Sequence, residues 1–488
     1  MKKLTATLLF CWVYSSTALS DGYFNNIMPL IKPPHSHTSV IATDLVNDTI
    51  IYEEDADILL LPASTQKLLT AVAATAELGE EFYYKTEVFS HFPIRNGKVA
   101  GDLFLKFSGD PTLTTLEIRS LLKQLTDQGL YEVEGNLYLV GQSHEQLQAP
   151  GWVWDDLGIC YSAPVSSYII NKNCIHGELR PKLASNKSQL KLASYLPVTV
   201  NNSAIFDKSR TRDFCNLELK RLPDNKFNLS GCYPGSTPLK LAIAITDPAL
   251  FALNSVRQIA KSSKIRVKGA VLLADSLPAH YTLLASHHSK PLPQLLDTML
   301  VKSDNLIADS LLKQIGEKRF NRPGNFSNGS KAMVQVLTEQ GIDLTHARIV
   351  DGSGLSRYNL LSARQLSQVL KLIYTVPRYE SIIASLPVAG VSGTLKYKSS
   401  FNRPPLHKHV LAKTGSMQGV DNLAGFIKRP NADDTLFVIL ENGQSPVEKE
   451  QQLAPFSALF LQTLIDHKFA ANETAASGPE TSTLSDNP

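Results

Sequence analysis

Residues 86–290 differ from the chain on either side of them in their pattern of helix and strand signals. This interruption constrains the fold more than any other feature of the sequence. The segment 97–141 alternates strand, helix and strand patterns, and the segment 249–274 repeats a helix followed by a strand. A chain of 488 residues is too long for one hydrophobic core, so we expect two or three domains. We interpret residues 86–290 as an inserted, mixed α/β region of two subdomains.

The flanks of this insertion predict helices and an antiparallel sheet. Residues 38–53 hold two strand patterns joined at a turn by Asn47 and Asp48, and an amphipathic helix pattern follows over 61–79. Residues 408–443 hold three apolar, β-rich runs separated by glycine and by Pro-Asn-Ala-Asp, which is typical of an antiparallel meander. Further helix patterns cover two stretches that meet near Ser303, and then 330–340, 362–375 and 451–469.

Both ends of the chain differ from a folded domain. Residues 1–20 have two lysines, a short apolar run and small residues before Asp21, which is the build of a cleaved signal peptide. The run is too short, and too often broken by Ser and Thr, to predict a membrane-spanning helix. Cleavage lowers the net charge from +3 to +1, a balance that implies no nucleic-acid partner. Residues 469–488 lack an apolar face, so we expect a disordered tail.

Four cysteines remain after such a cleavage, and all lie within the insertion. They are Cys160, Cys174, Cys215 and Cys232. An even number in an exported chain suggests disulfides, for which three connectivities exist. Their grouping favours the local pairs 160–174 and 215–232, and four buried thiols are the alternative. No zinc-binding spacing occurs, so we expect neither a metal nor another cofactor.

Three short motifs occur in an order that points to nucleophilic catalysis. The pattern Ser-x-x-Lys is weak evidence by itself, because a capping serine and a solvated lysine produce it too. Its four copies are Ser64/Lys67, Ser120/Lys123, Ser188/Lys191 and Ser310/Lys313. The first copy begins a predicted helix, Ser303-Asp304-Asn305 follows between helices, and Lys413-Thr414-Gly415 lies on a predicted strand. This order and setting favour one shared site over coincidence.

The residue types in the three motifs suit acyl transfer without a histidine. A serine hydroxyl needs a base within hydrogen-bonding reach, and Lys67 lies one helical turn from Ser64. Burial and a second cation, Lys413, would lower the pKa of Lys67, so that its neutral amine could take the serine proton. Ser303 could relay that proton to the leaving amine, while Asn305 holds Lys67 and a substrate amide.

The strand motif suits substrate recognition. Lys413 and Thr414 could bind a free carboxylate next to the cleaved bond. The backbone N–H groups of Ser64 and of Ser416, which directly follows Gly415, could form an oxyanion hole. The chain contains neither a Gly-x-Ser-x-Gly elbow nor a zinc-protease helix, which favours the Ser-Lys arrangement over other hydrolase sites.

The three motifs together resemble those of the penicillin-recognising serine enzymes. Ser64 and Ser303 are 239 residues apart and Ser303 and Lys413 are 110 apart, whereas the first gap is far shorter in simple serine β-lactamases. A long insertion after the Ser-x-x-Lys helix is similar to the D-alanyl-D-alanine carboxypeptidases/endopeptidases of the penicillin-binding protein 4 type, a low-molecular-mass class C group. The resemblance covers roughly residues 25–468. Its best-matched stretches are 109–114, 151–164, 351–359 and 413–426.

That resemblance implies a mixed α+β fold. The expected catalytic unit is a transpeptidase domain, similar to serine β-lactamases, with an antiparallel sheet covered by helices. It would comprise residues 21–85 and 291–468, split by the insertion 86–290 with its two nested subdomains.

The resemblance also implies a periplasmic enzyme that acts on peptidoglycan stem peptides. Members of the family cleave the terminal D-alanine, or the D-alanine–diaminopimelate cross-link, through an acyl-serine intermediate, and β-lactams acylate the same serine. Motif matching places four side chains against the diaminopimelate-containing peptide. These are Asp156, Tyr161, Arg357 and Gln418.

Two alternatives remain open from the sequence. A β-lactamase would turn penicillin over rapidly, whereas a peptidase would remain stably acylated. A non-catalytic wall-binding or sensing protein on the same fold would not be labelled by penicillin, or would still be labelled after Ser64→Ala.

Overall fold

The computed structural model describes residues 22–476 apart from short gaps, and its fold is mixed α+β, as predicted. The gaps are 143–144, 183–184, 208–214, 235–236 and 430–431. The predicted signal peptide and residues 477–488 of the predicted tail lie outside the described residues. Within the described part of the chain, no helix combines the length and the apolar character that crossing a bilayer requires.

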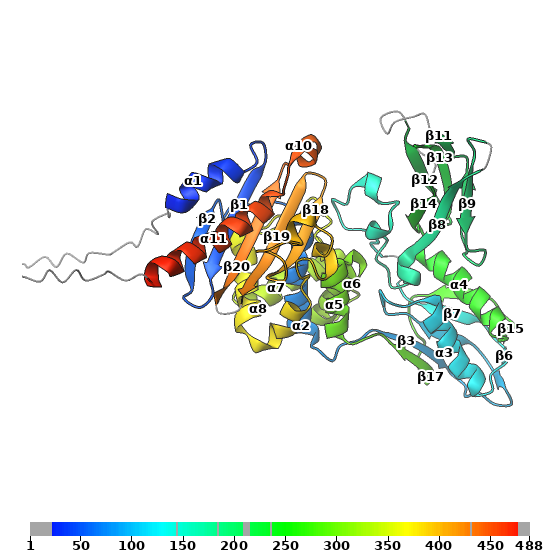
Figure 1. Ribbon diagram of the computed structural model, residues 1–488. Coiled ribbons are helices and arrows are strands. Elements are labelled where there is room, and N and C mark those ends of the chain that lie inside the picture. The colour runs from blue at the N-terminus through cyan, green and yellow to red at the C-terminus, as the bar shows by residue number, and fades with distance from the viewer. Residues whose placement is uncertain are drawn as a thin grey trace, which may run out of the picture.

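One five-stranded antiparallel sheet joins the two ends of the chain, in the order β18-β19-β20-β1-β2 (Figure 1). Its strands are β1 (His37–Asp44), β2 (Thr49–Glu54), β18 (Val410–Met417), β19 (Val420–Arg429) and β20 (Ala432–Asn442). The strand β1 pairs with β20 from His37 opposite Asn442 to Asp44 opposite Thr435. The predicted hairpin and the predicted meander are therefore confirmed as parts of one sheet.

Helices cover both faces of this sheet. In β20, Leu436, Val438 and Leu440 pack into the helical core on one face, and Phe437 and Ile439 between them pack into the core on the other face. The first face carries α2 (Lys67–Leu78), α5 (Leu292–Lys302), α6 (Asn305–Phe320), α7 (Phe326–Glu339) and α8 (Ala363–Thr375). The second face carries α1 (Gly22–Ile31) and α11 (Phe456–Ala476), which run side by side in Figure 1.

The last helix ends later than the sequence predicts. Because α11 extends to Ala476, the expectation of disorder from residue 469 is wrong for 469–476. Four of these eight residues are alanine, the strongest helix former, so the helix continues beyond its last apolar positions. Two shorter helices complete this half of the molecule. They are α9 (Glu380–Ala384) and α10 (Pro446–Gln451).

The inserted residues build two further sheet units on one side of the central sheet (Figure 1). In the first unit a mixed sheet of order β16-β7-β5-β3-β17 packs against two helices, α3 and α4. Its elements are β3 (Lys85–Ser90), β5 (Leu103–Lys106), α3 (Thr115–Asp127), β7 (Leu137–Val140), α4 (Pro248–Ser262), β16 (Val271–Ala274) and β17 (Thr282–His288). A small parallel sheet of order β15-β6-β4 joins β4 (Lys98–Val99), β6 (Glu132–Val133) and β15 (Arg266–Val267).

The second unit is a β-rich excursion between β7 and α4 of the first. Its sheets have the orders β14-β8-β9 and β10-β13-β11, and β12 pairs with β13. Its strands are β8 (Cys174–Pro181), β9 (Ser188–Leu192), β10 (Thr199–Asn202), β11 (Ile205–Asp207), β12 (Leu217–Leu222), β13 (Lys226–Pro234) and β14 (Leu239–Ala244). Disulfides join Cys160 to Cys174 and Cys215 to Cys232, so the two local pairings are confirmed.

Candidate active site

Ser64 and Lys67 lie where a short 3-10 turn, Ala63–Gln66, passes into α2. The Lys67 side chain is fully buried, and its Nζ lies 2.8 Å from Ser64 Oγ. Nζ also donates to Asn305 Oδ1 at 2.7 Å and to the backbone carbonyl of Ser353 at 2.7 Å. The predicted contact across one turn is therefore present, and two acceptors from distant parts of the chain fix the amine.

Burial lowers the pKa of Lys67 to about 8, and the nearby carboxyl groups of Asp309, Asp351 and Asp304 act against this shift when they are ionised. For Lys413, burial lowers the pKa well below its usual value, and the charges of Lys67 and Lys398 add to the effect. We expected both burial and the charge of Lys413 to lower the pKa of Lys67. Burial does lower it, whereas the repulsion between the two lysines lowers the pKa of Lys413.

The second motif lies between α5 and α6. Ser303 has a left-handed backbone with φ of 56°, and the Asp304 side chain caps α6 by accepting from the N–H of Ile307. This turn directs Ser303 Oγ toward Lys413, whose Nζ donates to it at 2.9 Å. Asn305 begins α6 and accepts from Lys67, and its Nδ2 donates to the carbonyl of Tyr161 at 2.8 Å.

The third motif occupies β18, beside the turn Ala63–Gln66 that carries Ser64, here called the nucleophile turn after the role that the sequence predicts for Ser64. Lys413 is fully buried and also donates to the Thr414 carbonyl at 2.9 Å, while the hydroxyls of Thr414 and Thr394 lie 2.7 Å apart. A Cβ on Gly415 would lie 2.8 Å from the Pro62 carbonyl, so only glycine allows the strand this close to the turn. Ser416 follows as an exposed residue.

The four residues that the resemblance places near the substrate form two pairs. The Tyr161 hydroxyl donates to the Asp156 carboxylate, and burial together with this hydrogen bond raises the pKa of Tyr161. The Arg357 guanidinium donates to the Gln418 carbonyl at 3.1 Å. Because Asn305 bonds the Tyr161 backbone, the Asp156–Tyr161 pair is tied to the Ser-Lys centre. The structure links Arg357 to Gln418 on the loop that follows β18.

The sequence did not predict two buried carboxyl groups that act on Lys67. Asp309, on α6, and Asp351 are both fully buried, and both act on the lysine. The segment 351–354 lies against the nucleophile turn, where a Cβ on Gly354 would be 1.9 Å from the Ala63 carbonyl. The available signals were the placement of Asp309 one turn after Asn305 and the glycines in this segment. Neither signal indicates a contact with α2.

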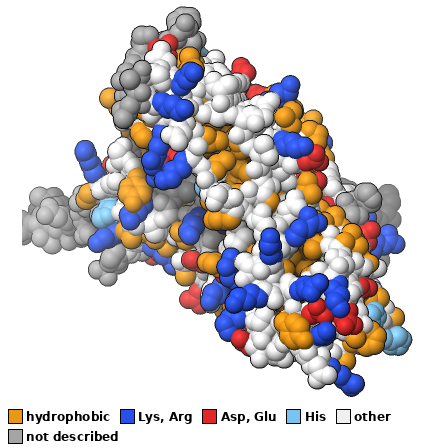
Figure 2. Space-filling view, turned by 90° about the vertical axis from the view of Figure 1, so that its right-hand side faces the viewer, with side chains coloured by type: hydrophobic (Ala, Val, Ile, Leu, Met, Phe, Trp, Pro, Cys, Tyr) orange, Lys and Arg blue, Asp and Glu red, His pale blue; other side chains and the backbone are white. Residues whose placement is uncertain are grey.

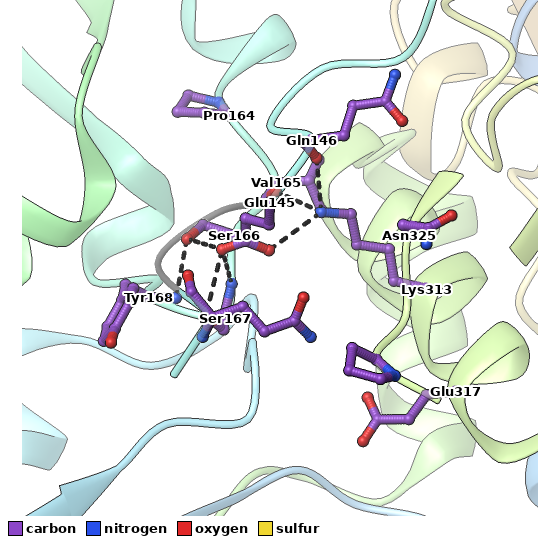
Figure 3. A network of polar contacts seen from close by, with 12 residues as sticks. Glu145, Gln146, Pro164, Val165, Ser166, Ser167, Tyr168, Lys313, Glu317 and Asn325 are labelled. Atoms are coloured by element: carbon purple, nitrogen blue, oxygen red, sulfur yellow. Dashed lines mark hydrogen bonds and ion pairs between the residues drawn. The ribbon is translucent and has the colours of Figure 1, made fainter. Parts of the chain in front are cut away.

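The other three copies of Ser-x-x-Lys do not form such a dyad. In the copy on α6, Lys313 Nζ donates to the carbonyls of Gln146 and Val165, both at 2.8 Å, and lies 3.3 Å from the Glu145 carboxylate (Figure 3). The Ser310 hydroxyl of that copy is buried with no partner among the described residues. The remaining lysines are Lys123, which pairs with Asp127, and Lys191, which is exposed on β9.

Comparison with known proteins gives a consistent answer along nearly the whole chain. The model of the D-Ala-D-Ala carboxypeptidase 3 (S13) family matches residues 27–461. "D-alanyl-D-alanine carboxypeptidase DacB" of Haemophilus influenzae is 34% identical over 462 residues, which cover 93% of this chain and 96% of the relative. A "D-alanyl-D-alanine carboxypeptidase" of an Actinomadura species is 29% identical and covers 84% of this chain and 78% of that protein.

Solved structures agree with the sequence relatives. The crystal structure of penicillin binding protein 4 from H. influenzae has a TM-score of 0.81 at 34% identity, covering 86% of this chain and 93% of that one. The same protein complexed with a β-lactam has a TM-score of 0.78 at 33% identity, with the same coverage of both chains.

Proposed function

The chain belongs to the D-Ala-D-Ala carboxypeptidase 3 (S13) family of serine peptidases, and from this membership and the site geometry we propose that Ser64 is its nucleophile and Lys67 its general base. The substrate would be a peptidoglycan stem peptide ending in D-Ala-D-Ala. The observation that carries the proposal is the 2.8 Å contact between a fully buried lysine amine and a serine hydroxyl.

The partners of Lys67 support a neutral amine. The Asn305 Oδ1 and the Ser353 carbonyl can only accept hydrogen bonds, whereas the Ser64 hydroxyl can also donate. A neutral amine has two N–H groups and one lone pair. It would donate to the two obligate acceptors and direct its lone pair at the serine proton, which is the arrangement of a general base.

The reaction would proceed through two acyl transfers. Ser64 Oγ attacks the carbonyl of the penultimate D-alanine while Lys67 takes its proton, and a bond forms between the serine oxygen and the carbonyl carbon. The C–N bond then breaks, and Ser303, whose Oγ lies 2.9 Å from Lys413 Nζ, relays the proton from Lys67 to the leaving amine, so that Lys67 is neutral again. Water next attacks the ester carbonyl while Lys67 takes one proton of that water. The C–O bond to Ser64 then breaks, and Lys67 returns the proton to Ser64 Oγ.

The remaining residues would bind the substrate. The N–H groups of Ser64 and Ser416 would stabilise the oxyanion, and Lys413 with Thr414 would act at the terminal carboxylate. Asp156, Tyr161, Arg357 and Gln418 would contact the diaminopimelate-containing part of the peptide. Their grouping in two pairs, one bonded to Asn305 and one joining Arg357 to the loop after β18, supports a substrate groove that passes Ser64.

We extend the proposal to cleavage of D-alanine–diaminopimelate cross-links, to acylation by β-lactams and to a periplasmic location. The acylation is supported by the solved complex of a relative with a β-lactam. The location is supported by the two disulfides, which are typical of an oxidising compartment.

Mass spectrometry of purified cross-linked muropeptides tests the function. After incubation with the enzyme we expect loss of a terminal alanine from pentapeptides and conversion of cross-linked dimers to monomers. The Ser64→Ala variant should produce neither change. Intact muropeptides after incubation with a wild-type enzyme that is folded would contradict the proposal, and rapid penicillin hydrolysis would favour the β-lactamase alternative.

A further inference from the structure

Asp309 is a buried carboxyl group to which the proposed mechanism gives no role. It lies on α6, and its side chain has no solvent exposure. Its Oδ1 accepts from the backbone N–H groups of Gly352 at 2.8 Å and Ser353 at 2.9 Å. Its Oδ2 is buried as well and has no hydrogen-bond partner among the described residues. Oδ1 of Asp309 therefore accepts two hydrogen bonds, whereas Oδ2 accepts none among the described residues.

The backbone that Asp309 holds leads directly to the catalytic lysine. The carbonyl of Ser353 accepts from Lys67 Nζ at 2.7 Å, and the carbonyl of Gly352 accepts from Thr70 Oγ1 at 2.6 Å. The two residues whose N–H groups bond Asp309 are thus the same two whose carbonyls bond α2. Asp309 therefore holds in place the Gly352–Ser353 backbone, whose Ser353 carbonyl orients the Lys67 amine.

The neighbouring carboxyl group of Asp351 differs in its surroundings. Its Oδ1 accepts from Gly354 N and Asn359 Nδ2, and its Oδ2 accepts from Trp152 Nε1 and Ser356 N. Both oxygens of Asp351 are therefore occupied by donors. A buried carboxylate oxygen without a donor is costly, so Asp309 is the less favourable place for a negative charge.

Electrostatics acts in the same direction. The charged groups that act on Asp309 are Lys67 from α2, Asp351 from the 351–354 segment and Lys313 on its own helix. Burial and, to a smaller extent, the charge of Asp351 together raise the pKa of Asp309 to about 8, against the opposing effects of Lys67 and of the hydrogen bonds from Ser353 and Gly352. At neutral pH this favours the protonated form.

We propose that Asp309 is a neutral positioning residue: in its protonated form it holds the Gly352–Ser353 backbone, and with it the Ser353 carbonyl, against Lys67. An ionised carboxylate at this place would favour the ammonium form of the lysine, whereas the neutral acid leaves the amine able to accept the Ser64 proton. The inference rests on the proposed role of Lys67 as the base. It adds the reason why two carboxyl groups can lie beside that base without keeping it protonated.

Two substitutions in the full-length enzyme separate the parts of this proposal. Asp309→Asn keeps an oxygen for the two N–H groups and resembles the neutral acid. Asp309→Ala removes the acceptor. The readout is the second-order rate of acylation by a fluorescent penicillin across the neutral and alkaline pH range. We expect Asp309→Asn to remain within about threefold of the wild type, with the same apparent pKa, and Asp309→Ala to lose about tenfold or more.

Ser310→Ala is the matched control, because it removes from the adjacent position of α6 a buried hydroxyl that has no partner in the described part of the chain, and it should change neither rate nor pH profile. Thermal unfolding of each variant reports on folding. Carbon-13 NMR of aspartate carboxyl groups gives an independent readout, since the signal lost in Asp309→Asn should have the shift of a protonated acid at neutral pH.

Three results would overturn the proposed role of Asp309. An Asp309→Asn rate as low as that of Asp309→Ala would show that the charge is needed. A shift of its pH profile to lower pH by about one unit or more, or a carboxylate shift in the NMR spectrum, would show that Asp309 is ionised. An unchanged rate in folded Asp309→Ala would remove the positioning role. A wild-type enzyme that penicillin does not label would instead refute the proposed function.

Discussion

Lys67 Nζ lies 2.8 Å from Ser64 Oγ, although the lysine side chain is completely buried. Burial of an amine without a paired carboxylate favours its neutral form, and the pKa of Lys67 is lowered to about 8. The contact thus joins the proposed nucleophile to a proposed base that a modest rise in pH makes available.

Ser64→Ala should abolish both D-alanine release and covalent labelling by penicillin, because Ser64 Oγ is the only hydroxyl hydrogen-bonded to Lys67 Nζ among the described residues. The fold should persist, since the side-chain oxygen contacts Lys67 at the surface of the site. Labelling and circular dichroism check the two statements. Residual labelling above that of a heat-denatured sample would mean that another residue is acylated.

Lys67→Ala should slow acylation by about 10²–10⁴-fold, the range that general-base assistance contributes. Lys191→Ala is the matched control, because that lysine belongs to another Ser-x-x-Lys copy and is exposed on β9. Stopped-flow or gel-based acylation rates provide the measurement. If both variants lost the same small factor, Lys67 would not be the base.

Lys413→Ala should reduce activity most on peptides that end in a free carboxylate. The lysine is bonded to Ser303 and to the Thr414 carbonyl, so its loss also disturbs proton delivery to the leaving amine. The ratio of kcat/KM for a free-acid peptide to that for its C-terminal amide isolates the carboxylate contact. If the variant were less active but this ratio were unchanged, Lys413 would act only in proton delivery to the leaving amine and would not bind the substrate carboxylate.

Removal of the 160–174 disulfide should loosen the loop that carries Tyr161, because Cys160 directly precedes it and Cys174 begins β8. We expect Cys160→Ser/Cys174→Ser to lose about 2–5 kcal/mol of stability and to raise KM by roughly tenfold for diaminopimelate-containing peptides.

The second disulfide provides a control of similar loop length. The disulfide between Cys215 and Cys232 spans a sequence separation of 17 instead of 14 and lies in the β-rich unit, and Cys215→Ser/Cys232→Ser removes it. This variant should lose comparable stability while KM changes by less than about twofold. Equal effects of the two variants on KM would remove the special role of the first disulfide.

The sequence predicts most of the local structure because its apolar periodicities are clear. The hairpin at 38–53 and the meander at 408–443 both occur, and the spacing of Ser64 and Lys67, taken together with the two other motifs, predicts their contact. The tail boundary was wrong because two pairs of alanines, at 470–471 and 475–476, extend a helix without an apolar stripe. Local rules therefore predict the elements that have a clear apolar pattern and fail where helix propensity alone lengthens an element.

The supporting residues of the site could not be predicted for the opposite reason. Lys67 meets the Ser353 carbonyl across 286 residues, and a backbone carbonyl leaves no mark in the sequence. Asp309 looks like an ordinary polar residue of an amphipathic helix until α2, α6 and the 351–354 segment are brought together. Burial of Lys413 likewise follows from the packing of β18 against the nucleophile turn.

The pH dependence of penicillin acylation tests the central claim most directly. If a neutral Lys67 removes the Ser64 proton, the second-order rate constant should rise about tenfold per pH unit at low pH and level off near the lysine pKa of about 8. A rate that is flat between pH values well below and well above this pKa, or one that falls as the lysine loses its proton, would contradict the account.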